Sequence, residues 1–188
     1  EIIPASLQSH RVNAYLYDGY WADVGTIQSF YDANIMLTQD RPPFRFYDPK
    51  KPVFTRPRFL AASRVIDSKI DHAMIAEGTY INRCSIEHSI VGIRTKVDVG
   101  ARVARSVLLG ADYYDEDAED RERSDVPLGV GVDSTLDRVI LDKNARVGRG
   151  VRLVNERGVD HEDGEFYAIR NGIIVIPKGA VVPDGTVV

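Results

Sequence analysis

The side chains in this sequence that are best suited to chemistry are basic ones in its last third. They are Arg138, Lys143, Arg146, Arg149, Arg152, Arg157, Arg170 and Lys178. Arginine grips phosphate oxygens with two parallel N–H donors, and lysine presents a compact positive charge. On one face of a fold, such residues would bind a phosphorylated small molecule. On a solvated surface, they would instead pair with nearby carboxylates. Those available are Asp133, Asp137, Asp142 and Glu156.

An acidic run precedes this basic region. The segment 110–129, GADYYDEDAEDRERSDVPLG, has eight acidic residues between Asp112 and Asp125, offset by Arg121 and Arg123. Such a run is typical of a solvated loop. Clustered carboxylates could also bind a divalent ion, but this run lacks the glycine that an EF-hand needs at a fixed loop position.

The element that must position these residues is indicated by apolar side chains that recur every five or six positions. They are Ile75, Ile81, Ile86, Val91, Val97, Val103 and Leu108, then Val130, Leu136, Leu141, Val147 and Leu153, and finally Ile176, Val182 and Val188. A helix repeats every 3.6 residues or so and a half-buried strand every two or so. The longer period predicts a parallel β-helix of hexapeptides, with three flat sides per coil. A β-sandwich, the alternative, would alternate more strictly.

Residues one coil apart stack in such a fold, so basic residues at similar corners can converge. Turn-prone pairs such as Glu77-Gly78 and Asp184-Gly185 mark the expected corners, because tight bends favour Gly, Asn and Asp. We expect the β-helix over residues 64–188, with an interruption by the acidic loop at 111–127.

The first 63 residues do not share the repeat. Val12–Tyr17 alternates like a strand, and Thr26 is a suitable N-cap for a helix that continues to about Leu37. These elements are too few to enclose a core, so residues 1–40 are expected to be a fragment, or an edge that packs on something else. Residues 41–63 are proline-rich and predict an extended connector.

Composition excludes several classes of protein. The chain has 188 residues and a net charge of −4, which argues against nucleic acid as a partner. It has no apolar run long enough to span a membrane. The single cysteine, Cys84, excludes an internal disulfide and fits a reducing compartment. We interpret it as a small, half-buried side chain rather than a catalytic thiol.

Histidine suggests two further alternatives. Hexapeptide β-helices are common among acyltransferases, which need a histidine base, and His72 and His88 are the candidates within the predicted β-helix. A zinc site would want three histidines close in sequence. His72 and His88 lie 16 residues apart, and His10 and His161 are distant.

Several strings together resemble one family, the ADP-glucose pyrophosphorylases, also called glucose-1-phosphate adenylyltransferases. They are YLYDGYWADVGTIQSFYDAN, FTRPRFL, SIVGIRTKVDVGARV, LLGADYY, VPLGVG, VILDKNARVG and NGIIVIPKGAVVPDGTVV. The resemblance implies a left-handed β-helix that supports a homo- or hetero-tetramer and binds allosteric effectors. It also implies an α/β nucleotidyltransferase domain that converts ATP and glucose 1-phosphate to ADP-glucose and pyrophosphate in glycogen or starch synthesis.

The same resemblance implies roles for individual residues. Asp23 in YWADVGT matches an acidic residue that helps to hold the catalytic Mg²⁺ of the complete enzyme. Lys143 in LDKNARVG and Lys178 in IPKGAVV match lysines that bind phosphorylated metabolites, and Arg146 is their expected neighbour. The segment NERGVDHEDGEFYAIR, residues 155–170, departs from the plant-like pattern and leaves the effector's identity open.

The family's glycine-rich nucleotide loop is not found in this sequence. Residues 1–40 therefore resemble the end of a catalytic domain whose remainder would be a partner, and we expect this chain to be inactive alone and to need no cofactor of its own. A free-standing scaffold or regulatory subunit and a hexapeptide acyltransferase remain as alternatives. The expected location is the cytoplasm, or the plastid of a plant.

Overall fold

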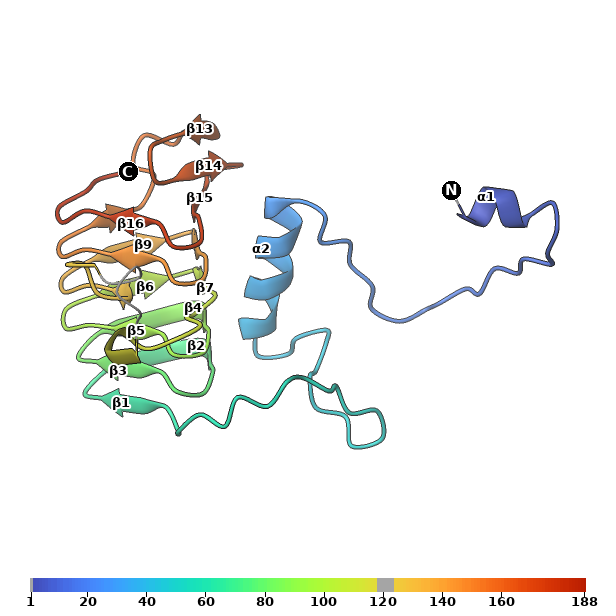
Figure 1. The fold of residues 1–188 in the computed structure, drawn as a ribbon, viewed down its shortest axis with the longest axis horizontal. Helices are drawn as coiled ribbons and strands as arrows, with labels where there is room; N and C mark the ends of the chain where they lie inside the picture. Colours follow the sequence, from blue (N-terminus) through green and yellow to red (C-terminus); the bar gives the residue numbers. More distant parts are fainter. Residues whose placement is uncertain (1, 118–123) are drawn as a thin grey trace.

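Parallel strands wind into a column of stacked coils, with a helix along one side (Figure 1). The structure, a computed structural model, describes residues 2–117 and 124–188. The described strands are mainly parallel and helices are short, so the prediction of a mainly β, parallel β-helix is confirmed. No described helix has both the length and the apolar character needed to cross a membrane.

Three rows of strands form the sides of the column. Face A consists of β1 (Arg64–Ile66), β3 (Tyr80–Asn82), β5 (Lys96–Val97), β8 (Gly129–Val130), β11 (Arg146–Val147) and β16 (Val181–Val182). Face B consists of the first halves of β2 (Lys69–Ile75) and β4 (Ser85–Val91), followed by β6 (Arg102–Ala104), β9 (Thr135–Asp137) and β12 (Arg152–Leu153). Face C consists of the second halves of β2 and β4, followed by β7 (Val107–Leu108), β10 (Val139–Leu141) and β15 (Ile173–Ile176).

The core is a stack of apolar side chains inside the column. In face B, Ile86 lies opposite Val103, which lies opposite Leu136, and Leu136 lies opposite Leu153. All four are essentially buried. Every residue of the predicted repeat belongs to this core or, for Ile75, packs against it. The repeat in the sequence therefore marks the residues that point into the column and stack on one another there.

The corners differ in part from the expected Gly, Asn and Asp. Left-handed backbone occurs at Asn144 (φ 61°), but also at His88 (φ 44°) and Arg105 (φ 45°). The neighbouring coil holds two of these residues in place: the Arg105 N–H donates to the Glu87 carbonyl and the Asn144 N–H to the Gly110 carbonyl, both at 3.0 Å. Hydrogen bonds between coils thus offset the cost of a conformation that these side chains otherwise avoid.

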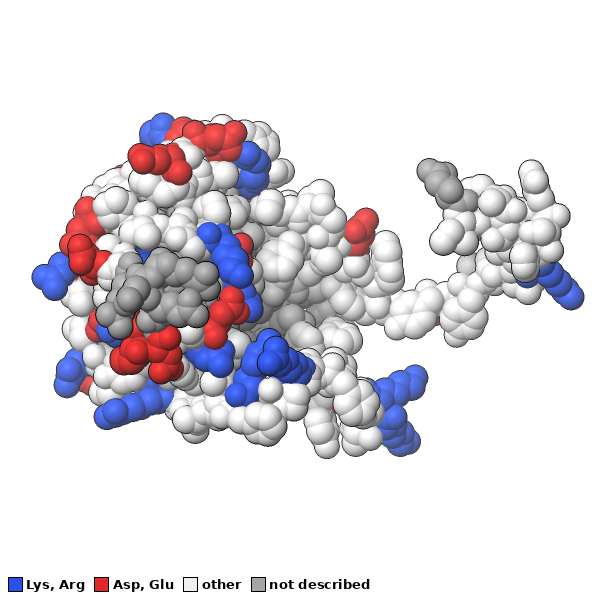
Figure 2. All heavy atoms as spheres, in the orientation of Figure 1, with Lys and Arg blue, Asp and Glu red and all other residues white. Residues whose placement is uncertain are grey.

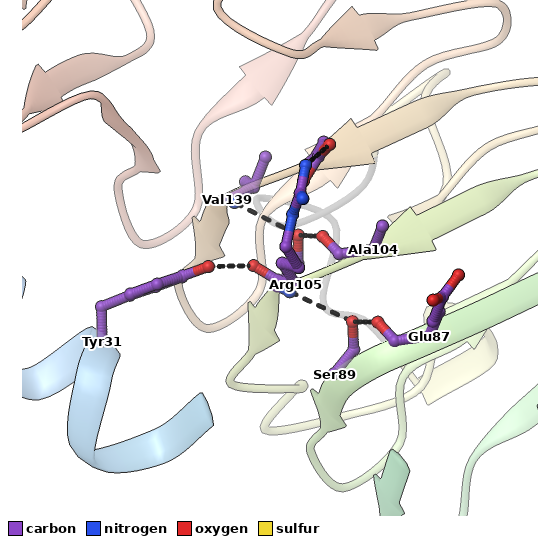
Figure 3. A network of polar contacts seen from close by, with 8 residues as sticks. Tyr31, Glu87, Ser89, Ala104, Arg105 and Val139 are labelled. Atoms are coloured by element: carbon purple, nitrogen blue, oxygen red, sulfur yellow. Dashed lines mark hydrogen bonds and ion pairs between the residues drawn. The ribbon is translucent and has the colours of Figure 1, made fainter. Parts of the chain in front are cut away.

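Serines link successive coils at the corner between faces B and C (Figure 3). The Ser89 hydroxyl accepts the Ser106 N–H at 3.1 Å and donates to the Glu87 carbonyl at 2.7 Å. One coil further, the Ser106 hydroxyl accepts the Val139 N–H at 3.2 Å and donates to the Ala104 carbonyl at 2.6 Å. These side chains satisfy backbone groups that a corner would otherwise leave unpaired.

The front of the chain contains α1 (Ile2–Ser6), α2 (Ile27–Ile35) and the 3₁₀ helix η1 (Met36–Thr38). The predicted helix is confirmed, and Thr26 caps it by a reciprocal pair of hydrogen bonds with Ser29. The predicted strand Val12–Tyr17 is wrong: these residues are irregular. A strand needs a neighbour for its backbone hydrogen bonds, and none of the named strand pairs of the structure includes this segment.

Helix α2 packs on the outer side of face C. Tyr31 from the helix forms a small buried cluster with Val107, Ile140 and Ile173. The apolar outer side of face C fits this arrangement, because parallel sheets are usually covered on both sides. The helix thereby joins residues 1–40 to the β-helix.

Two insertions interrupt the coils. The acidic segment, described at 111–117 and 124–128, contains the 3₁₀ helix η2 (Asp115–Asp117) and lies between β7 and β8. The remaining predicted loop residues, 118–123, lie outside the described part. The second insertion forms the antiparallel hairpin of β13 (His161–Asp163) and β14 (Ala168–Arg170), and β14 pairs antiparallel with β15 at the top of the column (Figure 1).

Candidate functional site

Two lysines that are distant in sequence meet at one carboxylate. Lys143 Nζ lies 2.6 Å from Asp112 Oδ1, and Lys178 Nζ lies 3.2 Å from Asp112 Oδ2. We call Asp112, Lys143, Lys178 and Asn144 the lysine site. It brings together the two lysines that the resemblance singles out.

The register of face C explains why the lysines meet. Leu141 of β10 pairs with Ile176 of β15, and each lysine follows its strand by two residues. Leu141 also pairs with Leu108 on its other side, so the segment leaving β7 passes the same corner. Three successive coils therefore deliver Asp112, Lys143 and Lys178 to one place.

Asn144 holds the Asp112 backbone. Its Oδ1 accepts the Asp112 N–H at 2.7 Å, and its Nδ2 donates to Asp112 Oδ2 at 3.2 Å. Asn144 itself adopts left-handed backbone at the corner (φ 61°), a conformation that asparagine tolerates well. The lysine site is thus built on a fixed turn.

The electrostatics of the lysine site favour anions. The pKa of Asp112 is lowered from 3.8 to about 2. The main cause is the hydrogen bond from Lys143, and those from Lys178 and Asn144 add to it. Asp112 is consequently ionised at neutral pH. The side chains of Lys143, Lys178 and Asp112 are 35%, 60% and 39% exposed, so a solute can reach all three.

Arg146 does not join the lysine site. It lies on β11 of face A, and its side chain is only 4% exposed. Its Nη1 contacts Asp115 Oδ1 and the Val126 carbonyl, both at 2.8 Å. Asp115 Oδ2 also accepts the Leu128 N–H at 2.8 Å. Arg146 thus fastens both described ends of the acidic segment to the column.

The other described basic residues are distributed over the column, so beyond the two lysines the alternative of a solvated surface with local partners fits better than one converged cluster. Each of several arginines contacts a group near its own corner. The contacts are Arg138 with the Tyr31 ring, Arg152 with Glu156, Arg157 with Glu162 and Arg170 with Asp163. Of the carboxylates named as alternatives, Glu156 pairs as expected and Asp137 pairs with Arg105 instead. Figure 2 shows positive and negative side chains intermixed on the visible face of the β-helix.

The histidine pair lies at the corner between faces B and C. The rings of His72 and His88 are stacked, with centroids 4.6 Å apart. His72 Nδ1 is 2.8 Å from Asp71 Oδ1, and its Nε2 is 3.1 Å from Asp40 Oδ1. Both ring nitrogens of His72 therefore face carboxylates. The arrangement ties Asp40, which follows η1, to the column.

This contact predicts a pH dependence. Asp71 first, and Asp40 to a smaller extent, raise the pKa of His72 above its ordinary value of 6.5. Because the folded-state pKa is the higher one, the contact contributes fully below the unfolded pKa and is lost as pH rises through the folded one. We expect the NMR titration midpoint of His72 to fall toward 6.5 in Asp71→Asn. Asp40→Asn should lower it less, and equal midpoints in all three chains would contradict the assignment.

The described residues do not complete a metal site. Asp23 is exposed, and its Oδ1 accepts the Gly25 N–H at 3.0 Å in a local turn. Over residues 2–117 and 124–188, no group of three or more His, Cys, Asp or Glu side chains is placed to hold a metal ion. One carboxylate alone is a poor fit to the oxygen-rich shell of Mg²⁺.

Cys84 is buried in the core at 7% exposure, deeper than the half-buried position that the sequence predicted. Burial raises the pKa of its thiol, and this keeps the thiol protonated and unreactive at neutral pH.

Sequence reasoning did not identify Asp112, Asn144 or Tyr31 as functional residues. A signal for Asp112 was present in the spacing, since GADYY leaves β7 one coil before DKNARVG leaves β10. Tyr31 carried no such signal. Its hydroxyl donates to the Arg105 carbonyl at 2.6 Å across 74 positions of sequence.

A family model described as the GLGC left-handed parallel beta-helix domain matches residues 58–187. The match covers most of the chain and begins just before β1, and its description agrees with the parallel column. It confirms the left-handed winding that the resemblance implied, an exception to the right-handed rule for parallel connections. The chain belongs to this family, and it contains the carboxy-terminal β-helix domain of an ADP-glucose pyrophosphorylase, or glucose-1-phosphate adenylyltransferase.

Proposed function

We propose that this β-helix is a regulatory and assembly region, and that Lys143 and Lys178 bind a phosphorylated effector of the enzyme. The observation that carries the proposal is the convergence of both lysines on one carboxylate. Two ammonium groups held around a single anion offer the charge and the donors that a phosphate group requires. Arg146 has no part in this proposal because Asp115 holds it under the acidic segment.

The proposed effector site lies beside a joint between two parts of the chain. Lys143 and Lys178 follow β10 and β15, whose outer side chains Ile140 and Ile173 pack against Tyr31 of α2. A ligand at the lysine site is therefore close to the strands on which α2 rests. Allostery would require that these strands or α2 have two arrangements that the ligand distinguishes.

The remainder of a catalytic domain is the proposed partner of α2. The helix borders an apolar hollow of about 460 Å³. It is lined by Tyr20, Trp21, Phe30, Leu37, Phe44 and Phe46, among others. Trp21 is 76% exposed, and exposed apolar surface of this kind marks an interaction site. That domain would supply the Mg²⁺ and nucleotide chemistry, in a cytoplasmic tetramer.

Charge reversal at either lysine tests the proposed effector site. We expect Lys143→Glu and Lys178→Glu each to weaken the binding of inorganic phosphate by about tenfold, because one attraction becomes a repulsion. Binding can be followed from the NMR shifts of the backbone amides of residues 142–145 and 178–180 during a phosphate titration of the 188-residue chain.

Lys96→Glu is the matched control. Lys96 is also half exposed and also pairs with an aspartate, Asp98, at 3.1 Å, but it lies on β5 of face A. It should bind phosphate at residues 142–145 as the unsubstituted chain does. The proposal fails if the unsubstituted chain shows no phosphate-dependent shifts at these amides, or if all three variants bind equally.

A further inference from the structure

The lysine site already holds an anion that belongs to the chain itself. Asp112 receives Lys143 on one oxygen at 2.6 Å, and Lys178 and Asn144 on the other, both at 3.2 Å. A phosphate group bound to the same lysines would need the same donors. The Asp112 side chain and a ligand phosphate therefore compete for one position.

We propose that Asp112 is a built-in competitor that sets the affinity of the lysine site: a phosphorylated ligand binds by displacing the Asp112 carboxylate from Lys143 and Lys178. This inference rests on the proposed effector site and adds a regulatory residue to it. The residue comes from the acidic segment, to which neither the sequence pattern nor the resemblance assigned a role.

Displacement requires only that the side chain turn away. The Asp112 N–H stays on Asn144 Oδ1 at 2.7 Å, and the Ala111 N–H before it donates to the Ile93 carbonyl at 2.9 Å. Three residues after Asp112, Asp115 is fixed by Arg146 and by the Leu128 N–H. The backbone is thus held on both sides, and the half-exposed carboxylate can rotate into water.

The competition also selects the charge of the ligand. A phosphate monoester carries about −1.5 to −2 charges at pH 7, with a second pKa of about 6, whereas Asp112 carries a single charge. A dianion gains more attraction from the two lysines than the carboxylate loses, but a monoanion does not. The site should therefore take phosphate monoesters in their dianionic form and reject simple carboxylates.

The test compares Asp112→Asn with the unsubstituted 188-residue chain, with inorganic phosphate as the probe and acetate as a monoanionic comparison. Asparagine keeps the size of the side chain and the N–H that Asn144 accepts. It removes both the competing charge and its repulsion of the ligand. We expect phosphate to bind Asp112→Asn about tenfold more tightly, because ligand binding no longer has to break two exposed ion pairs. Acetate should bind to Asp112→Asn but not to the unsubstituted chain.

Asp133→Asn is the control, since it removes one negative charge at an exposed corner in front of β9. It should leave phosphate affinity at the lysine site unchanged. Asp112→Ala provides a second variant with the same expected gain, and the amide shifts of residues 142–145 report that the corner is intact.

The outcomes separate the two proposals. If phosphate binds through Lys143 and Lys178 but Asp112→Asn and Asp112→Ala bind it no better or less well, Asp112 organises the lysines and the competitor proposal is overturned. An equal gain in Asp133→Asn would reduce the effect to net charge and would also overturn it. If neither the unsubstituted chain nor the variants bind phosphate, the effector site itself fails and the competitor fails with it.

Discussion

Replacement of Tyr31 by alanine should release α2 from the β-helix. The side chain is 5% exposed, and its hydroxyl donates to the Arg105 carbonyl across the joint (Figure 3). The Arg138 guanidinium lies 5.6 Å from the centre of the ring. Truncating a buried aromatic costs about 3 kcal/mol or more, and a helix as short as α2 is not stable alone in water.

Hydrogen exchange of the α2 amides measures this release. A loss of about 3 kcal/mol corresponds to exchange that is faster by about a hundredfold in residues 27–35. Amides of β9 and β10 should keep their protection, because the stacked core does not depend on the helix. Tyr31→Phe keeps the ring and loses one hydrogen bond, worth about 1 kcal/mol. Unchanged exchange of α2 in Tyr31→Ala would show that the helix is held elsewhere.

The second large effect is expected at Gly110, where two coils approach closely. Its φ is 86°, and a Cβ there would lie 2.2 Å from the Ile93 carbonyl oxygen of the preceding coil. Gly110→Ala therefore adds a clash with backbone to the cost of left-handed alanine. We expect the free energy of unfolding to fall by about 3 kcal/mol or more, as measured by urea denaturation.

Gly179→Ala separates the two causes. Gly179 lies at the same corner with φ 70°, but a Cβ there would meet nothing within 4 Å. Only the conformational cost, roughly 1–2 kcal/mol, applies to it. If both variants lose the same stability, the close approach of the coils contributes nothing. Because Gly110 is two residues before Asp112, Gly110→Ala should also disturb the lysine site.

The column could be predicted because the residues of its core recur at short, regular intervals along the sequence. Each strand contributes an inward apolar side chain such as Leu136, and the spacing between these residues is the length of one side. Helix α2 was predictable for a similar reason, since the Thr26 cap and the apolar face lie within a dozen or so neighbouring residues.

The contacts between distant residues could not be predicted in this way. Lys143 and Lys178 reach the same carboxylate only because the β13–β14 hairpin lies between them in sequence without adding a coil to the column, so that β10 and β15 are neighbours. Asp112 looked like part of a solvated acidic run, and its partners are set by the register of face C. Arg146 shows that nearness in sequence does not ensure nearness in space. It lies only three positions after Lys143, but on another face, where it pairs with Asp115. The partner of Tyr31 likewise depends on how the helix lies on the finished column.

The charged outer strand of the β13–β14 hairpin has a consequence for solubility. A column of parallel coils is in principle a template for endless addition of further chains, because each open edge offers unpaired backbone groups. On face C, the neighbour of β15 in the sheet is β14, which runs the opposite way, and the outermost strand β13 contains charged Glu162 and Asp163. Because β13 runs in the same direction as β15, only these charges, and not the direction of the edge strand, oppose an incoming parallel strand there. The hairpin thus caps one of the three rows of strands. It helps to prevent the β-helix from extending into a fibre by addition of further chains.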